Sequence, residues 1–172
     1  MFEGTYTALI TPMRDGKVDL DDLRQLVDYQ IAEGITGLVP CGTTGETPTL
    51  SAEEQREIIR TVVDQAKGRV LVIAGAGANS TQTAIAQTQA VAELGVDATL
   101  QVTPYYNKPS QSGLLAHFSA IADASPLPLV LYNVPGRTGC DMLPATIATL
   151  ADHPKVAAVK EATGSIARGQ TV

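Results

Sequence analysis

Lys160 is the residue of this sequence that is best placed for covalent chemistry. It follows the apolar run Val-Ala-Ala-Val at residues 156–159 and opens the sequence Lys-Glu-Ala-Thr-Gly, which predicts an amine at the end of a buried strand. A lysine attacks a ketone only as the neutral amine, and burial among apolar side chains lowers its pKa from about 10.4. The position indicates a Schiff-base lysine. The alternative is a lysine whose ammonium reaches solvent or pairs with Glu161.

Tyr132 and Arg137 lie near the end of the preceding apolar run and add two further reactive groups. Tyr132 is on the predicted strand next to that of Lys160, so its hydroxyl could pass protons to and from a carbinolamine or an enamine. Arg137 lies in the turn Pro-Gly-Arg-Thr-Gly, and a guanidinium offers two parallel donors to a carboxylate. The three residues indicate carbonyl chemistry on a carboxylate-bearing substrate; a core tyrosine and a surface arginine are the alternatives.

Two loops supply the remaining candidates. Thr43 and Thr44 lie in the sequence Gly-Thr-Thr-Gly-Glu, whose glycines let backbone N–H groups approach a small anion while the two hydroxyls add donors. A tight turn without a ligand is the alternative. Tyr105 and Tyr106, in Thr-Pro-Tyr-Tyr-Asn, could line the same site or pack against another chain.

Other motifs predict structural roles. Residues 75–80 resemble the start of a dinucleotide fingerprint, but Ser80 stands where the third glycine belongs, so we expect a turn and no nucleotide site. His117 and His153 are predicted to lie on the surface.

Composition limits the class of protein. The 172 residues, 44% hydrophobic and 17% charged, suit one soluble globular domain. A net charge of −6 without any basic block argues against a nucleic acid partner. No apolar run approaches the roughly 20 residues that span a bilayer, and no secretory leader pattern occurs, so we expect a cytoplasmic protein. Cys41 and Cys140 are predicted to be reduced thiols at strand ends, with no zinc site or disulfide.

Apolar runs recur about every 30 residues, which is the length of a βα unit. The runs begin near Thr5, Gly37, Val70, Ala98, Pro128 and Val156. Apolar residues between them repeat at helical spacing, and one helix has a clear start because Ser51 and Glu54 form a capping box, with Gly68 to end it. The sequence predicts an α/β domain with a parallel sheet.

The spacing does not distinguish an open doubly wound sheet from a barrel. The polar candidates favour a barrel, because they fall at or just beyond the C-terminal ends of predicted strands, where (β/α)8 barrels carry their chemistry. These candidates are Thr43, Thr44, Tyr105, Tyr106, Tyr132, Arg137 and Lys160. We therefore expect residues 1–172 to form one partial TIM-barrel domain with about six of the eight βα units, lacking strands seven and eight and a C-terminal helical segment.

Five short sequences in order, GTTGE, GAGAN, TPYYN, YNVPGRTG and KEATG, resemble the dihydrodipicolinate synthase family of pyruvate-dependent class I aldolases. The resemblance runs from the start of the chain to about Ser165. It implies condensation of pyruvate with L-aspartate 4-semialdehyde to 4-hydroxy-tetrahydrodipicolinate in lysine biosynthesis, by way of a covalent imine and without a cofactor.

The resemblance also implies roles for the catalytic candidates. Lys160 would form the imine with pyruvate and Tyr132 would serve as its acid and base. Thr44 would join Tyr132 and Tyr106 in a proton relay. Because the tyrosine that matches Tyr106 comes from a neighbouring subunit in this family, the relay would require a homo-oligomer, a dimer or a tetramer.

The resemblance assigns the substrate carboxylates too. Thr43 and Thr44 would hold the pyruvate carboxylate, and Arg137 would receive that of the semialdehyde. Arg137 argues against the related N-acetylneuraminate lyases, which usually carry an apolar residue there. Family members inhibited by lysine bind it with histidine and glutamate; Ala52, Gln55 and Thr83 at matching positions predict weak feedback.

Two alternatives from other classes stay open. The chain could be a truncated and catalytically inactive fragment that keeps the five motifs but cannot close a barrel. A binding protein on the same fold is disfavoured, because it would have little reason to keep both Lys160 and Tyr132.

Overall fold

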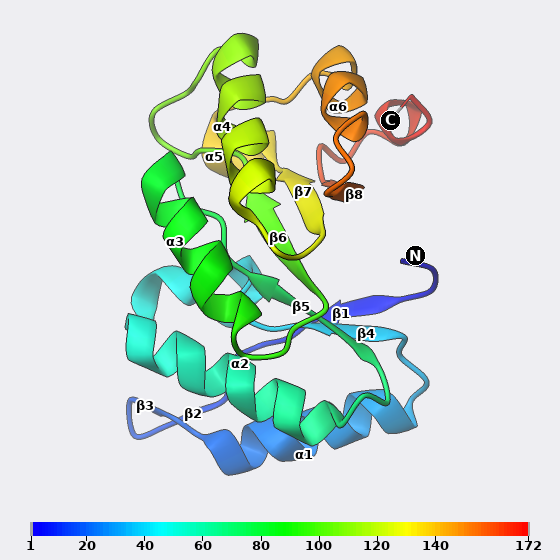
Figure 1. The fold of residues 1–172 in the computed structure, drawn as a ribbon. Coiled ribbons are helices and arrows are strands. Elements are labelled where there is room, and N and C mark those ends of the chain that lie inside the picture. The colour runs from blue at the N-terminus through cyan, green and yellow to red at the C-terminus, as the bar shows by residue number, and fades with distance from the viewer. Residues whose placement is uncertain (1, 172) are drawn as a thin grey trace. The chain divides into compact units, whose positions relative to one another are not determined.

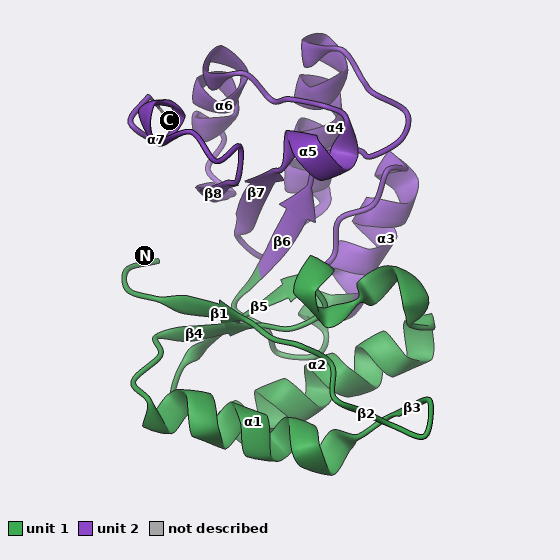
Figure 2. Ribbon diagram, turned by 180° about the vertical axis from the view of Figure 1, so that it is seen from behind, with its two compact units in different colours: residues 1–75, 91–98 green, residues 76–90, 99–172 purple. Residues whose placement is uncertain are grey.

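The computed structural model describes residues 2–171, along which strands and helices alternate (Figure 1). The chain separates into two units, residues 1–75 with 91–98 and residues 76–90 with 99–172 (Figure 2). Within each unit the main strands run parallel, as the spacing of the apolar runs predicted. No helix of residues 2–171 has the length and apolar character needed to cross a membrane.

Unit 1 is built on three parallel strands in the order β1, β4, β5. The strands are β1 (Tyr6–Ala8), β4 (Gly37–Val39) and β5 (Leu71–Gly75), and the two α-helices are α1 (Leu20–Ala32) and α2 (Ala52–Ala66). Helix α2 packs against both α1 and β5. Leu23 and Val27 of α1 are fully buried, as are Leu38 of β4 and Val62 of α2, so the core of this unit lies between the helices and the strands.

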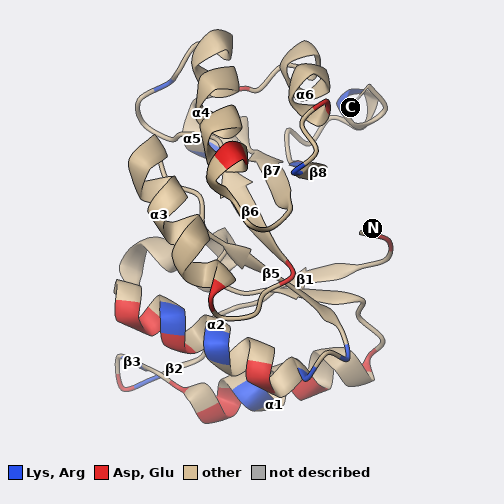
Figure 3. Ribbon diagram, viewed as in Figure 1, with Lys and Arg blue, Asp and Glu red and all other residues tan. Residues whose placement is uncertain are grey.

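The ends of α1 and α2 follow from local side-chain chemistry. Asp19 caps α1, accepting hydrogen bonds from the first-turn backbone. The predicted capping box of α2 is confirmed: the Ser51 N–H donates to Glu54 Oε2 at 2.8 Å and the Glu54 N–H donates to Ser51 Oγ at 3.2 Å. The helix ends at Ala66, ahead of Lys67 (φ 50°) and Gly68 (φ 70°). Acidic and basic residues are interspersed along both helices (Figure 3).

A short hairpin precedes α1 and was not predicted. It pairs β2 (Met13–Arg14) with β3 (Lys17–Val18) in antiparallel fashion. The turn residues Asp15 and Gly16 have φ of 52° and 76°, the left-handed pair that a two-residue hairpin turn requires. The Asp-Gly dipeptide is the sequence signal for such a turn, but two-residue strands are too short to show an apolar period.

Unit 2 is built on three further parallel strands in the order β6, β7, β8. They are β6 (Ala98–Val102), which belongs to this unit from Thr99, β7 (Leu129–Asn133) and β8 (Val156–Glu161). Its helices are α3 (Thr81–Ala92), of which the last two residues belong to unit 1, α4 (Gln111–Ala124), α5 (Pro135–Thr138), α6 (Pro144–Ala151) and α7 (Ile166–Gly169). The core joins α4, α6 and β7 through Leu114, Phe118, Leu129, Leu131 and Leu150.

The predicted burial of β8 is wrong. The strand lies where the sequence predicted it, but no residue of β8 is fully buried. Among the residues that the structure describes in this unit, β8 pairs only with β7, so its other edge lacks a covering strand. Lys160 is accordingly exposed on one side, and it is the penultimate residue of the strand.

Candidate active site

Lys160 and Tyr132, which the sequence predicted to lie on neighbouring strands, are in contact. The parallel ladder of β7 and β8 aligns Tyr132 with Lys160, so both side chains project from the same face of the sheet. Lys160 Nζ lies 4.4 Å from the centroid of the Tyr132 ring. The Tyr132 residue is only 6% exposed, and no hydrogen bond within residues 2–171 engages its hydroxyl. The phenol can therefore exchange protons with a ligand at Lys160.

The surroundings of Lys160 act on its charge in two directions. Partial burial disfavours the ammonium and lowers the pKa of Lys160 below its ordinary value. The face of the Tyr132 ring attracts a cation, which opposes this effect. Desolvation thus favours the neutral amine that attack on a ketone requires.

Arg137 lies in α5, the four-residue helix that follows β7. Its side chain is exposed, and no acidic group of the described chain is within ion-pair distance of its guanidinium. The helix is held in place because Thr138 Oγ1 lies within hydrogen-bond distance of Val134 O at 3.2 Å and of Cys140 O at 2.9 Å, and because Gly139, at φ 68°, ends it. A rigid turn thus presents an uncompensated cation beyond the C-terminal end of β7, which suits a carboxylate.

Tyr106 lies in the loop after β6 and has an unusual backbone. Its φ is 75°, a region that an aromatic residue enters only at a cost of about 1–3 kcal/mol. The loop is anchored because the Tyr106 N–H donates to Thr138 O at 3.3 Å and Asn107 Nδ2 donates to Asn79 O at 2.9 Å. The side chain is 91% exposed, so almost nothing in the described chain covers it. The fold holds this ring out into solvent.

Thr43 and Thr44 begin a 3₁₀ turn, η1 (Thr43–Gly45), beyond β4 in unit 1. Both residues are exposed, and neither hydroxyl is engaged in the hydrogen bonds found among residues 2–171. The turn is fixed from behind, because Thr11 Oγ1 donates to Gly45 O at 2.7 Å and Thr47 Oγ1 donates to Gly42 O at 2.9 Å. Two free hydroxyls on a fixed turn are donors that a small anion could use, and the predicted anion site stays a prediction.

The six predicted site residues are thus divided between the units. Unit 2 carries Tyr106, Tyr132, Arg137 and Lys160 at the C-terminal ends of β6, β7 and β8 or in the loops that follow, and the structure brings Lys160 and Tyr132 into direct contact. Unit 1 carries Thr43 and Thr44. A relay through Thr44, Tyr132 and Tyr106 stays a prediction.

The glycines of residues 75–80 serve backbone packing. A Cβ at Gly75 would overlap the carbonyl of Cys41, and one at Gly77 would lie 2.5 Å from the backbone nitrogen of Val102. The prediction that Cys140 is at a strand end is wrong, because it follows α5; both thiols are free and buried. Burial raises the pKa of Cys41 to about 12, which makes it a poor nucleophile.

The prediction that His117 lies on the surface is also wrong, since the residue is 5% exposed. Its Nδ1 lies 2.9 Å from Thr81 Oγ1, its ring meets Phe118 edge-on at 4.9 Å between centroids, and its Nε2 is buried without a partner. His117 lies three residues after Leu114 and four before Ile121, which places it on the apolar stripe of α4. This spacing could have predicted that His117 is buried. His153 is half-buried and pairs with Asp123 at 3.1 Å.

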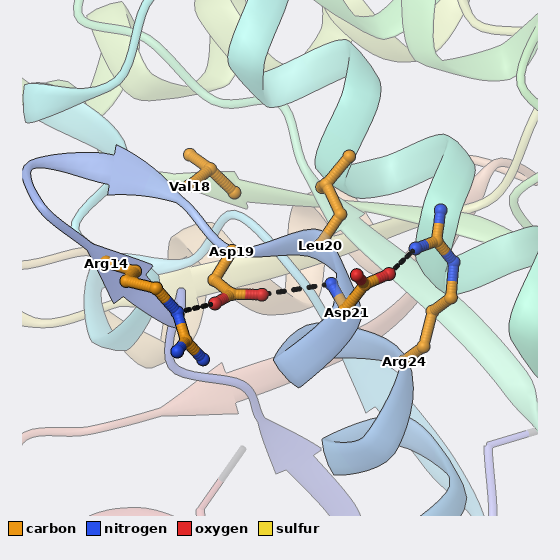
Figure 4. A pocket seen from close by; sticks show the side chains of 6 residues that line it. All are labelled: Arg14, Val18, Asp19, Leu20, Asp21 and Arg24. Atoms are coloured by element: carbon orange, nitrogen blue, oxygen red, sulfur yellow. Dashed lines mark hydrogen bonds and ion pairs between the residues drawn. The ribbon is translucent and has the colours of Figure 1, made fainter.

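A surface pocket lies elsewhere, at the β2–β3 hairpin and the start of α1 (Figure 4). Its charged groups are paired with one another: Arg14 lies 2.6 Å from Asp19, and Arg24 lies 2.7 Å from Asp21. None of the predicted site residues lines it. Within residues 2–171 there is also no cluster of three or more His, Cys, Asp or Glu that could hold a metal ion.

Four residues that were not candidate site residues in the sequence surround the ends of β7 and β8. Asn133 and Glu161 directly follow Tyr132 and Lys160, and Asp141 and Arg168 pack against them. An amide that follows the tyrosine and a carboxylate that follows the lysine are a weak signal, because either could equally be solvent-exposed.

Comparison with known proteins identifies a family that this chain matches. A sequence model described as the dihydrodipicolinate synthetase family matches residues 1–172. A 4-hydroxy-tetrahydrodipicolinate synthase of Maridesulfovibrio salexigens is 57% identical over 166 residues, which are 96% of this chain and 57% of that protein.

Two solved structures have the same fold. The chloride-inhibited dihydrodipicolinate synthase of Acinetobacter baumannii, complexed with pyruvate, superposes with a TM-score of 0.97 at 48% identity, over 99% of this chain and 59% of that one. A structure described as the first monomeric dihydrodipicolinate synthase variant superposes with a TM-score of 0.97 at 40% identity, over 99% of this chain and 57% of that one. The fold is that of part of a (β/α)8 barrel, as predicted, and the chain spans just over half the length of these relatives.

Proposed function

This chain belongs to the dihydrodipicolinate synthetase family, and we propose that its protein condenses pyruvate with L-aspartate 4-semialdehyde to 4-hydroxy-tetrahydrodipicolinate, a step of lysine (diaminopimelate) biosynthesis. The observation that carries the proposal is the amine of Lys160, with a lowered pKa, placed 4.4 Å from the ring of Tyr132. The similar protein of Acinetobacter baumannii is described as complexed with pyruvate, which supports pyruvate as one substrate.

The first chemical step needs only these two residues. The neutral Nζ of Lys160 attacks the keto carbon of pyruvate, and a C–N bond forms while the keto oxygen takes up a proton. Tyr132 can supply the further proton with which that oxygen leaves as water, giving the imine. The same hydroxyl can then assist removal of a methyl proton, which gives an enamine.

The enamine carbon is the nucleophile for the second substrate. It adds to the aldehyde carbon of the semialdehyde, and the amino group of that substrate then displaces Nζ from the imine carbon, which closes the ring and frees Lys160. One water is released overall. The lysine imine serves as the electron sink, so the proposal requires no further cofactor.

The substrate carboxylates have matching donors. We assign the semialdehyde carboxylate to Arg137, whose guanidinium is uncompensated. The pyruvate carboxylate is assigned to Thr43 and Thr44, whose hydroxyls are free on a fixed turn. An N-acetylneuraminate lyase activity is less well supported, because the relatives found are synthases.

The relay through Thr44, Tyr132 and Tyr106 is proposed to operate in a homo-oligomer, a dimer or a tetramer. Support comes from Tyr106, which is 91% exposed on a strained and anchored backbone and so is suited to insertion into a second copy. That one relative is described as the first monomeric variant indicates that association is usual among these enzymes. Loss of the predicted oligomer in Tyr106→Ala, by size-exclusion chromatography, would support this assignment; an unchanged elution volume would oppose it.

Two further parts of the proposal concern the location and the regulation of the protein. A cytoplasmic location is proposed, as for other biosynthetic enzymes. Weak feedback by lysine is proposed as well, because the Gln55 amide already donates to Thr47 O at 3.2 Å and Leu50 O at 3.1 Å, leaving it little capacity for a ligand.

The test is formation of product by the purified chain. Pyruvate and the semialdehyde are mixed with the chain, and the reaction is followed by mass spectrometry of the small molecules. We expect the cyclic product with the wild-type sequence and none with Lys160→Arg, which keeps the charge but not the nucleophile. A folded wild-type chain that gives no product would support the alternative of an inactive fragment.

A further inference from the structure

We propose that Asn133 is a positioning residue, which holds the ends of β7 and β8 in the register that sets the reactive lysine against the tyrosine. It acts within a group of polar side chains, the Asn133 clamp. The clamp consists of Asn133, Asp141, Glu161 and Arg168. The inference deepens the proposed function, since it rests on the roles given above to the reactive pair.

The clamp lies directly behind the reactive pair. Successive residues of a strand point to opposite faces, so Asn133 faces away from Tyr132, and Glu161 faces away from Lys160. The register pairs Asn133 with Glu161 just as it pairs Tyr132 with Lys160. Asn133 and Glu161 are therefore the residues next in sequence to Tyr132 and Lys160, and they lie on the opposite face of the same two strand ends.

The amide of Asn133 is fully buried and satisfied on both sides. Its Nδ2 donates to Asp141 Oδ1 at 2.9 Å and to Glu161 Oε2 at 3.1 Å, while its Oδ1 accepts from the Met142 N–H at 3.0 Å. The Met142 N–H can only donate, which fixes the orientation of the amide. Two carboxylates need an NH₂ group between them, and no other side chain of this size and shape supplies one.

Arg168 offsets the charge that this arrangement gathers. Its NH2 lies 3.0 Å from Asp141 Oδ1 and its NH1 lies 3.2 Å from Asp141 Oδ2, a two-pronged pair. Its Nε lies 3.8 Å from Glu161 Oε2. The Arg168 side chain is 17% exposed and the Glu161 side chain 10%, so solvent screens this pair only weakly, whereas Asp141 is 38% exposed. Arg168 thus ties α7 to both carboxylates.

Glu161 stays ionised in the clamp. Burial by itself raises the pKa of its carboxyl, but the hydrogen bonds from Asn133 and from the Thr163 N–H, together with the charge of Arg168, outweigh burial, so that the pKa falls below its usual value. The clamp is therefore intact at neutral pH, where Lys160 must react.

The clamp matters for chemistry because it joins four segments at one point. Asn133 ends β7, Glu161 ends β8, Asp141 lies in the loop before α6 and Arg168 lies in α7. Beyond its ladder with β7, the end of β8 has no partner strand among the residues described for this unit, so side chains must fix it. A displacement of about 1 Å between reacting groups can cost about 100-fold in rate.

The first measurement reads the position of Lys160 without any substrate. Protein labelled with ¹³C at the lysine ε-carbons is examined by NMR. Lys160 is assigned with Lys160→Arg, and the shift caused by the aromatic ring is identified with Tyr132→Leu. We expect an upfield shift for Lys160 in the wild type, which is lost in Asn133→Asp because that change sets a third carboxylate against two others.

Rescue and control variants separate positioning from general damage. Adding Glu161→Gln to Asn133→Asp restores a donor opposite the new carboxylate, and we expect part of the shift to return. Asp123→Asn breaks the ion pair with His153, near the opposite end of β8, and should leave the shift unchanged. If Asn133→Asp does not fold, Glu161→Gln alone, which keeps the shape and removes the charge, is read in the same way.

The second measurement is the initial rate at which pyruvate and borohydride modify Lys160. We expect Asn133→Asp to lower it on the order of tenfold, with recovery in the double variant. A folded Asn133→Asp that keeps both the wild-type shift and the wild-type rate overturns the inference. If the shift responds as expected but the wild type forms no adduct, the positioning role stands and the proposed function fails.

Discussion

Lys160 and Tyr132 occupy paired positions on β8 and β7, with the amine nitrogen 4.4 Å from the centroid of the phenol ring. The ring attracts the ammonium, whereas burial lowers the pKa of Lys160 and favours the amine. Loss of the proton also removes the attraction to the ring. The neutral amine is then free to turn toward a carbonyl carbon while the hydroxyl of Tyr132 stays nearby.

Changing Tyr132→Phe should slow imine formation without loss of the fold. The ring that fills the site is kept, but the group that exchanges protons is removed, and such a group typically contributes about 10²–10⁴-fold. The rate of pyruvate-dependent labelling of Lys160 measures the effect. A rate within a factor of about two of the wild type would assign proton transfer to another group.

Changing Arg137→Ala should mainly impair use of the semialdehyde. Because the guanidinium is placed at the carboxylate of the second substrate, we expect its KM to rise by about 10- to 100-fold, from the loss of about 1.5–3 kcal/mol for a charged hydrogen bond. Pyruvate labelling of Lys160 should persist. Loss of labelling together with unchanged semialdehyde kinetics would show that Arg137 serves pyruvate. Arg137→Lys keeps the charge but not the two parallel N–H donors, so its KM for the semialdehyde should lie between those of the wild type and Arg137→Ala.

Changing Gly75→Ala should destabilise unit 1. The added methyl group would overlap the carbonyl of Cys41, and overpacking of this kind costs about 1–3 kcal/mol. Gly42→Ala is the matched control, because a Cβ at Gly42 would meet nothing within 4 Å. Urea denaturation of the two variants checks the difference, and equal midpoints would show that the contact at Gly75 relaxes freely.

Stability should fall in mild acid because of His117. Burial lowers the pKa of its imidazole in the folded chain, so below about pH 6.5 the unfolded chain binds a proton that the folded chain refuses. Proton uptake on unfolding makes the free energy of unfolding decrease as the pH falls from about 7.5 to about 5.5. This contribution is present above the unfolded pKa and is lost as the pH drops toward the folded one.

Urea denaturation across that range measures the slope. His117→Leu should flatten it, whereas His153→Gln, which keeps His117, should retain the contribution of His117. An unchanged slope in His117→Leu would assign the acid sensitivity to other groups.

The strand pattern could be predicted from the sequence because each strand carries its own apolar run. The observed starts at Tyr6, Leu71 and Leu129 fall one residue beyond the predicted ones, and the other three coincide. Turn glycines, the capping box of Ser51 and the placement of Lys160 beside Tyr132 depend on contacts close in sequence or on strand order. Such features are readable without a structure.

The features that the sequence did not reveal depend on contacts between distant segments. His117 meets Thr81 of α3, and nothing near His117 in sequence reports that contact. The clamp joins Asn133 to Arg168 through Asp141, three residues on separate elements. The exposure of β8 likewise depends on which strands cover it, which no pattern within β8 records.

The central claim is that Lys160 is a Schiff-base nucleophile, and borohydride trapping tests it most directly. The purified chain is mixed with pyruvate and reduced, and the modified residue is located by peptide mass spectrometry, with Lys155 as an internal comparison on the same segment. The account predicts a pyruvate adduct on Lys160 that is absent from Lys155 and from Lys160→Arg. A folded chain with no adduct, or with label spread evenly over its lysines, would contradict it.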